Sequence, residues 1–338
     1  MLRKIAVWGS SLFPSSLKIL TYRALLGARI GHAVKIKLAS VIMSEKIEIE
    51  DGVVIGSNVH IMCKEIRIGE ESIICAEVRI DGEDSLSIGK NCYVGQRTHI
   101  NATEPVTIED GVGIGNDTSI FTHGVWVSYL EGLPRKFAPV KICRDSWVPP
   151  RCIVQPGVTI GPNAIIATGA VVTKDVPGEV FAGGIPAIVI RKIEDLKEPI
   201  DLPEKDRRTR EMLHAFIDHV RASAGCLLVP QVSEEGVFFA PQKGSKKRYG
   251  IYYLTKQVSD KTLESLLLRR AELDSLAVVA LRGFTVAASV LEGKGRFIEW
   301  FDLERFVRKR SWNRLSILLR DFLRGHYGVR FALEPESK

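Results

Sequence analysis

The sequence predicts a mainly β protein, with a parallel β-helix preceded by a short N-terminal helix and followed by a C-terminal α/β or α+β domain. Three observations support this prediction. Ile or Val recurs every six residues at twenty-one positions, one long interruption breaks that register, and the pattern changes after Pro203. A period of six fits neither the alternation of an isolated strand nor the 3.6-residue repeat of a helix, but it is typical of stacked β-helix coils.

Residues 12–27 are expected to form the short helix, within a cap that we assign to residues 1–29. Lys18 would lie outside its apolar face, which would carry Leu17, Leu20, Ala24 and Leu25. A stack of repeats needs such a cap, because its first coil would otherwise leave the core open. A helix that lies on a membrane surface is the alternative.

Residues 30–193 are expected to form the β-helix. The recurring Ile and Val occupy positions 30, 36, 42, 49, 55, 61, 68, 74, 80, 88, 94, 100, 108, 114, 120, 142, 148, 154, 160, 166 and 172. Each hexad would form one flat face with one inward side chain, so three hexads make a coil of about eighteen residues. A β-sandwich of short strands is the alternative, and it does not predict a constant phase over so many repeats.

The long interruption runs from Phe121 to Lys141, and His123 stands near its start. Loops extruded from a rigid scaffold are frequent places for function. Imidazole takes up protons near neutral pH, so His123 is a candidate general base. The other interpretation of His123 is a surface histidine without a chemical role.

Residues 194–203 are expected to form a linker, and residues 204–338 a basic α/β or α+β domain of unknown role. Residues 200–338 hold 25 Lys or Arg and 18 Asp or Glu, which accounts for the whole net charge of +7. Helices are expected over residues 204–223, 261–273 and 315–327, with strands between them. The excess basic residues favour solvated surfaces, and binding to an anionic glycan or to an acidic membrane surface is the alternative. No pattern of aromatic residues interleaved with the basic ones supports binding to nucleic acid.

The six cysteines show neither a CxxC motif nor a metal-binding Cys/His spacing, so we expect reduced cysteines and no bound metal. No run of eighteen apolar residues predicts a membrane span. The start of the chain faintly resembles a signal peptide, but Gly9-Ser10-Ser11 and Pro14 break the apolar stretch. We therefore expect a cytoplasmic protein, with contact to the inner face of the membrane as an open alternative.

Four local motifs match a known family. They are Ile120-Phe121-Thr122-His123, then Lys136-Phe137-Ala138-Pro139-Val140 in the loop, Trp147 at the restart, and the stretch from Val154 to Arg191 with Ala182-Gly183-Gly184-Ile185-Pro186. On these motifs, residues 30–193 resemble the hexapeptide-repeat acyltransferases, and in particular the sugar O-acetyltransferases. The resemblance implies a left-handed β-helix, a homotrimer, and acetyl-CoA as the acyl donor.

The resemblance also assigns roles to residues. His123 would be the general base for transfer of acetyl to a sugar hydroxyl, in surface polysaccharide biosynthesis. Asn101 would bond the acceptor hydroxyl or the oxyanion. The residues expected along the donor are Trp147, Thr168, Thr173, Lys174 and Arg191.

Two departures from the family pattern leave the acceptor open. Pro150 stands where the family usually has a small residue after Trp-Ile-Gly, and Arg97 stands where the sugar enzymes often carry Asn. The alternatives are an N-acetyltransferase for an amino (nucleotide) sugar and a non-catalytic scaffold that trimerises the C-terminal domain. A metal-dependent hydratase on the same fold would need a second histidine near His123, and the next one is His214.

Overall fold

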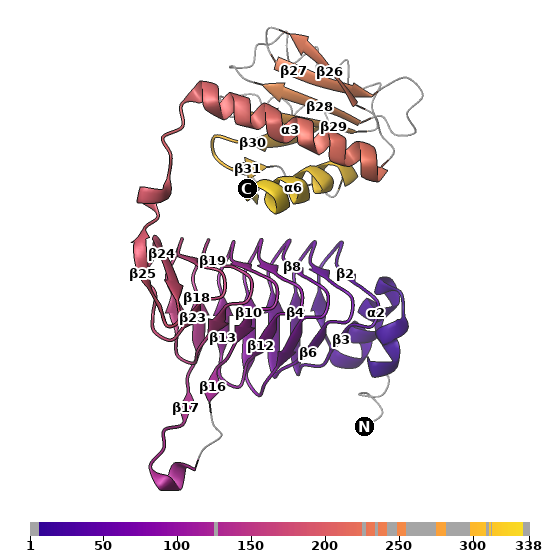
Figure 1. Cartoon of the computed structure of the whole chain (residues 1–338). Coiled ribbons are helices and arrows are strands. Elements are labelled where there is room, and N and C mark those ends of the chain that lie inside the picture. The colour runs from indigo at the N-terminus through magenta and orange to yellow at the C-terminus, as the bar shows by residue number, and fades with distance from the viewer. Residues whose placement is uncertain are drawn as a thin grey trace, which may run out of the picture. The chain divides into compact units, whose positions relative to one another are not determined.

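The computed structural model describes residues 7–124, 128–224, 228–233, 236–241, 249–254, 275–281, 298–308, 311 and 313–333. The chain divides between Lys197 and Glu198 into two compact units. The first unit is the predicted parallel β-helix, in which successive coils stack along one axis (Figure 1). Among the described residues, no helix is both long and apolar enough to cross a lipid bilayer.

Three parallel sheets form the three faces of the β-helix. The first face consists of β1 (Arg29–Ile30), β4 (Lys46–Ile49), β7 (Glu65–Ile68), β10 (Ser85–Ile88), β13 (Val106–Ile108), β18 (Val140–Ile142) and β21 (Thr159–Ile160). The second consists of β2 (Lys35–Ile36), β5 (Val54–Ile55), β8 (Ile73–Ile74), β11 (Tyr93–Val94), β14 (Gly113–Ile114), β19 (Trp147–Val148), β22 (Ile165–Ile166), β24 (Val180–Gly184) and β25 (Ala187–Lys192). The third consists of β3 (Val41–Ile42), β6 (His60–Met62), β9 (Arg79–Asp81), β12 (His99–Asn101), β15 (Ser119–Ile120), β20 (Ile153–Val154) and β23 (Val171–Val172).

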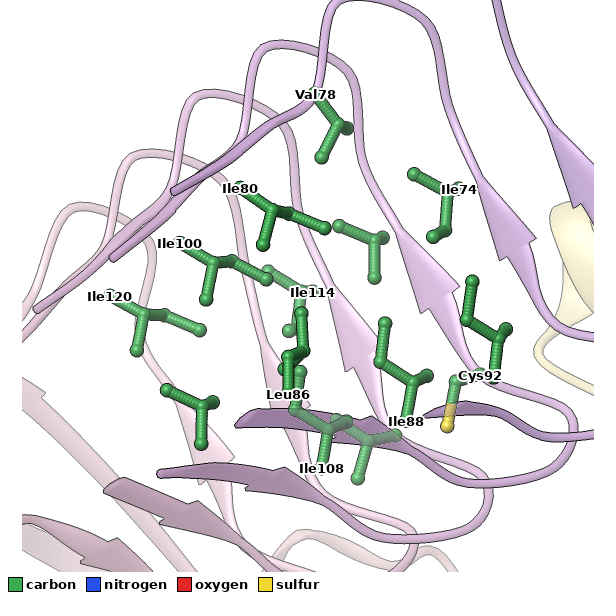
Figure 2. Close-up of a cluster of buried hydrophobic side chains, with 14 of the residues drawn as sticks. Ile74, Val78, Ile80, Leu86, Ile88, Cys92, Ile100, Ile108, Ile114 and Ile120 are labelled. Carbon is green, nitrogen blue, oxygen red and sulfur yellow. The ribbon is translucent and has the colours of Figure 1, made fainter. Parts of the chain in front are cut away.

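The recurring Ile and Val fill the interior of this prism. All twenty-one are buried, with at most 7% of any one exposed. In the parallel register, Ile80, Ile100 and Ile120 stack directly on one another along the third face (Figure 2). Burial of an aliphatic side chain of this size stabilises a fold by about 1.5–3 kcal/mol, so the hexad positions supply the continuous core.

Three corners connect the faces. The first corner joins the first face to the second, the second corner joins the second to the third, and the third corner leads to the next coil. Non-glycine residues with positive φ recur at the first two corners, among them Asn91, Asp117 and Asn163. Asn and Asp tolerate this left-handed conformation better than most residues, which lets the chain turn sharply without glycine in every coil.

The N-terminal cap is helical as expected, but its buried face differs from the prediction. Helix α2 (Ser15–Leu26) follows the short helix η1 (Ser10–Leu12) and packs on β1 and β2. Lys18 and Tyr22 are fully buried, whereas 47% of Leu17 and 63% of Leu20 are exposed. The prediction that both leucines face the core is therefore wrong.

The reason lies in the backbone of the first coil, which has no preceding coil to bond. The Lys18 Nζ donates to the Lys37 carbonyl at 2.5 Å, and the Tyr22 hydroxyl accepts the Ile42 N–H at 3.3 Å. Buried backbone groups must find partners, so polar side chains turn inward at this open end.

The second unit is an α/β structure with one mixed sheet. In sheet order its described strands are β26 (Leu228–Ser233), β27 (Gly236–Pro241), β28 (Tyr249–Leu254), β29 (Ser275–Ala280), β30 (Ile298–Asp302), β31 (Val307–Arg308) and β32 (Ala332–Leu333). Helices α3 (Leu202–Ala224) and α6 (Arg314–Tyr327) share one apolar core with this sheet, in which Phe216 meets Phe322. The helix expected over residues 261–273 lies outside the described residues. The stretch expected as a linker contains the short helix η3 (Glu194–Leu196).

Candidate active site

The long interruption is a loop that leaves the β-helix at the third corner. It begins with β16 (His123–Gly124) and returns through η2 (Tyr129–Glu131) and β17 (Lys136–Phe137), which pairs antiparallel with β16 (Figure 1). The pairing sets His123 opposite Phe137. Both ends of the loop therefore meet at its base, next to the wall formed by the third face.

His123 is half-buried and hydrogen-bonded to the side chain of Asn101. The His123 Nδ1 lies 2.8 Å from the Asn101 Oδ1. Asn101 ends β12, one coil before β15, and only 6% of it is exposed. A carbonyl oxygen can only accept, so Nδ1 carries the hydrogen and Nε2 keeps its lone pair. This is the tautomer that a general base acting through Nε2 requires.

Thr122 and Thr103 fix the orientation of the Asn101 amide. The Thr103 backbone N–H, which can only donate, lies 3.4 Å from the Asn101 Oδ1. The buried Thr122 Oγ1 lies 3.1 Å from the same oxygen and 3.0 Å from the Asn101 backbone carbonyl, and it accepts the Glu104 N–H. These donors place the oxygen of the amide, and not its nitrogen, against the imidazole. Asn101 therefore orients the ring through its Oδ1, and the contact of Asn101 with the acceptor hydroxyl or the oxyanion stays a prediction.

The loop covers one face of the imidazole. The Phe137 ring stacks on His123 with 5.7 Å between centroids and 24° between planes. The Arg135 guanidinium lies over Phe137 and Tyr129, at 5.7 Å and 5.3 Å from the ring centroids. An aromatic wall and a hydrogen bond together limit the ring to one orientation, which is a condition for efficient general-base catalysis.

Trp147 lies at a different corner from His123. It begins β19 on the second face, directly after the first corner, and it is half-exposed. A Cβ on Gly113, its ladder neighbour, would lie 3.3 Å from the Trp147 Cδ1, so the indole rests over that glycine. The strand β18 of the first face separates Trp147 from the loop, so a single chain does not bring His123 and Trp147 together.

The other predicted donor residues are all exposed but spread over the prism. Thr173 and Lys174 follow β23 at the third corner, two strands along the face from His123. Strand spacing places them about 10 Å along the axis from it. Thr168 lies at the second corner, and Arg191 lies in the terminal strand β25. Only Thr173 and Lys174 thus share a corner with the candidate base.

Arg97 and Pro150, the two departures from the family pattern, both lie at the second corner, one face away from His123. The Arg97 guanidinium makes two hydrogen bonds to Asp117 one coil further on, at 2.7 and 3.0 Å. The pKa of the Asp117 carboxyl is lowered by this hydrogen bond. The Pro150 carbonyl accepts the Gly169 N–H. Neither residue contacts the imidazole, so these substitutions leave its environment unchanged.

No group of three or more His, Cys, Asp or Glu side chains in the described part of the chain could hold a metal ion. The five cysteines that the structure describes form no disulfide with one another, and three of them are buried. Burial raises the pKa of the Cys92 thiol to about 11, so this sulfur stays a neutral thiol at physiological pH. It is a core side chain and not a nucleophile.

Sequence reasoning missed the groups that hold the base in place. Thr122 was visible only as part of a motif, although its burial beside Asn101 gives it a structural task. The ring contact of Phe137 depends on a pairing of two-residue strands, which leaves no periodic signal in a sequence. Asn101, the polar residue at the end of β12, was the feature of the sequence that could have indicated a partner for His123.

Two family models match the β-helix. A model described as "Hexapeptide repeat of succinyl-transferase" matches residues 46–81 and 85–122, and one described as "Bacterial transferase hexapeptide (six repeats)" matches residues 139–174. Among curated proteins, the chain is 33% identical over 130 residues to galactoside O-acetyltransferase of Escherichia coli. It is 36% identical over 118 residues to a putative acetyltransferase of Saccharomyces cerevisiae.

These matches cover part of each protein. They span 38% and 34% of this chain, and 64% and 60% of the two relatives. Among solved structures, galactoside acetyltransferase in complex with coenzyme A matches with 21% identity and a TM-score of 0.33, over 59% of this chain and 84% of that one. The N-acyltransferase AntD of Bacillus cereus, with dTDP and 3-hydroxybutyryl-CoA, matches with 14% identity and a TM-score of 0.37, over 61% and 95%.

The described coils, the buried hexads and the matched models agree with one another over residues 46–81, 85–122 and 139–174. This part of the chain is built from hexapeptide repeats, and its resemblance is to the hexapeptide-repeat, sugar O-acetyltransferase-like family.

Proposed function

We propose that this protein transfers an acetyl group from acetyl-CoA to a hydroxyl group of a sugar. The His123 Nε2 takes the hydroxyl proton while the oxygen attacks the thioester carbonyl carbon. The carbon–sulfur bond then breaks, and the imidazolium returns the proton to the departing thiolate, so an acetyl ester and free coenzyme A are formed. The thioester is already activated, so no covalent enzyme intermediate is needed.

The observation that carries the proposal is the hydrogen bond from His123 to Asn101. It selects the tautomer whose Nε2 can accept a proton, and the Phe137 ring holds the imidazole from one side. A surface histidine without a chemical role needs neither a buried amide partner nor the buried Thr122 hydroxyl behind it. Supported partners of this kind are typical of residues that act in catalysis.

In this proposal the donor would lie in the groove between two neighbouring copies of the chain. Lys174 and Arg191 suit the phosphates of coenzyme A because both are exposed cations. Thr168 and Thr173 would contact the pantetheine arm, and Trp147 would line the thioester end. In one chain Trp147 and His123 lie on opposite sides of the first face, so the proposal includes a homotrimer in which neighbouring copies share each site.

Sharing between copies can be tested by mixing two inactive variants. His123→Ala and Trp147→Ala protomers are unfolded together, refolded as a mixture and assayed. If sites form between copies, some sites in mixed trimers contain both intact residues, and activity reappears above that of either variant alone. If each chain carries its own site, mixing restores no activity.

The reaction itself is tested by incubating the protein with acetyl-CoA and a panel of sugars, followed by mass spectrometry. An acetyl ester on a sugar that mild alkali removes supports O-transfer, whereas an alkali-stable amide on an amino sugar would replace the proposal by N-transfer. His123→Ala is expected to lower turnover by about 10²–10⁴-fold. Turnover within tenfold of wild type would remove His123 from its role. We assign the product to surface polysaccharide biosynthesis.

A further inference from the structure

The N-terminal cap carries exposed apolar side chains that the β-helix does not use. Leu12, Phe13, Leu17, Leu20 and Leu38 form what we call the cap platform, and between 41% and 70% of each is exposed. Isolated exposed apolar residues are ordinary on a protein surface, but a contiguous group of large ones is typical of a contact site. The cap platform lies at the opposite end of the solenoid from β25.

The platform is contiguous because of helix geometry. Leu17, Leu20 and Ala24 are spaced by three and four residues, so they form one stripe along α2, and Phe13 precedes the N-cap Pro14 of that helix. Lys18 and Tyr22, on the other side of the helix, are buried against the first coil. Leu38 joins the stripe through η1, because the Ala39 N–H donates to the Ser11 carbonyl at 2.9 Å.

The charge around the platform has one sign. Residues 1–44 contain seven Lys or Arg and no Asp or Glu. Residues 1–199 hold 22 basic and 22 acidic side chains, so residues 45–199 hold 15 basic and 22 acidic ones. Arg23 is exposed on α2, and Lys35 and Lys37 are exposed on the first coil, against which α2 packs. The net positive charge of the first unit is thus concentrated in the segment that carries the cap platform.

We propose that the cap platform docks on an anionic lipid bilayer. A helix with exposed leucines and aromatic residues, flanked by Lys and Arg, inserts its apolar side chains at the headgroup boundary while its cations bind acidic lipids. Trp8, exposed at 44% and in edge contact with His60, has the amphipathic ring that favours this boundary.

The same charges argue against a second copy of this chain as the occupant. A two-fold contact places a patch against itself, so two platforms would bring like charges together with no acidic side chain from residues 1–44 to offset them. An anionic bilayer complements the platform in both respects, because its headgroups attract the cations and its acyl region accepts the apolar side chains. This inference is independent of the acetyl transfer proposed above.

The test uses the full chain and co-sedimentation with vesicles. Vesicles of phosphatidylcholine alone are compared with vesicles that contain about 30% phosphatidylglycerol. We expect binding to the anionic vesicles and at least a tenfold drop in the partition coefficient for Leu17→Ser/Leu20→Ser. Lys35→Gln/Lys37→Gln should lower the partition coefficient by about tenfold or more, and only for the anionic vesicles. Leu196→Ser, which removes another exposed leucine, is the matched control and should bind as wild type does.

Both double variants replace solvent-exposed side chains, so the melting temperature should stay unchanged and acetyl transfer in solution should persist. Equal binding of wild type to both kinds of vesicle, or full binding by Leu17→Ser/Leu20→Ser, would overturn the proposal. The platform would instead be a protein interface if no vesicles bind and Leu17→Ser/Leu20→Ser lowers the mass of the assembly in solution.

Discussion

Replacement of Asn101 by Ala tests how the base is held. In the wild-type protein the Asn101 Oδ1 accepts the His123 Nδ1–H at 2.8 Å, in a place where Asn101 is almost completely buried. The substitution removes that acceptor and leaves the imidazole with the Phe137 ring as its described support. No side chain that contacts substrate in the proposed mechanism is removed, so Asn101→Ala isolates the positioning effect.

The magnitude follows from the charge that develops during the reaction. When Nε2 takes the hydroxyl proton, the ring becomes cationic, and the bond to Asn101 becomes charge-assisted. Hydrogen bonds to charged groups contribute about 1.5–3 kcal/mol, and neutral ones about 1 kcal/mol. Only the difference between the two, about 0.5–2 kcal/mol, affects kcat. Because 1.4 kcal/mol corresponds to a tenfold change in rate, we expect kcat to fall by about 2–30-fold, with a KM for acetyl-CoA close to that of wild type.

The assay is steady-state acetyl transfer, followed by release of the coenzyme A thiol. The decisive comparison is the double variant Asn101→Ala/His123→Ala. If Asn101 acts only through His123, the double variant should be no slower than His123→Ala alone, because residues that act as a unit are non-additive. Thr122→Val, which keeps the shape but removes one donor to the amide, should show a smaller loss.

Two outcomes would refute this reasoning. One is Asn101→Ala with the same turnover as wild type. The other is a double variant that is slower than His123→Ala by the full factor of Asn101→Ala, which would mean that Asn101 contacts the substrate directly. Melting temperatures of all four variants control for misfolding, since Asn101 also accepts from Thr122.

Three further predictions concern the scaffold. Ile100→Ala in the fully buried core should cost about 2–5 kcal/mol in urea unfolding, whereas Leu130→Ala, at 97% exposure, should stay within about 0.5 kcal/mol of wild type. Gly82→Ala should lower the melting temperature, because φ is +153° and a Cβ would meet the Ala102 backbone; an unchanged value would contradict this. The hydrogen bond from Lys141 lowers the pKa of the Glu109 carboxyl in the folded protein. The ion pair therefore stabilises the fold fully at pH values above the carboxyl's unfolded pKa, and this stability is lost as the pH falls through the carboxyl's folded pKa. Glu109→Gln should therefore flatten the acid limb of melting temperature against pH.

The core was predictable because one physical demand repeats in every coil. Each face of every coil buries the aliphatic side chain at its hexad position, so Ile and Val at every sixth residue mark the interior, to which the first face adds a second buried side chain in most of its strands, such as Leu86 beside Ile88. The interruption after Ile120 was equally visible, because it displaces the next Ile of the six-residue register to Ile142. The position of His123 at the base of the loop follows from the same count.

The cap shows where this kind of reasoning failed. Leu17 and Leu20 look like a core face if only apolar spacing is considered, yet Lys18 and Tyr22 are the buried residues. The first coil has backbone carbonyls and amides without a neighbouring coil, and their need for partners outweighs the gain from two buried leucines. A pattern of hydrophobicity does not reveal this need for hydrogen-bond partners, because the need depends on which strand lies at the end of the stack.

The relation between His123 and Trp147 shows a second limit. In the sequence they flank one interruption, which suggested a common gap between the end of one coil and the restart of the next. In the prism they lie at the third and the first corner, with β18 between them. Rigid coils cannot close that separation by bending, since each strand is bonded on both sides. Either the proposed base His123 and the aromatic Trp147 contact different molecules, or a neighbouring copy brings Trp147 to the loop that holds His123. Only the second arrangement gives one acetyl group access to both, which is why the proposed activity and the proposed trimer depend on each other.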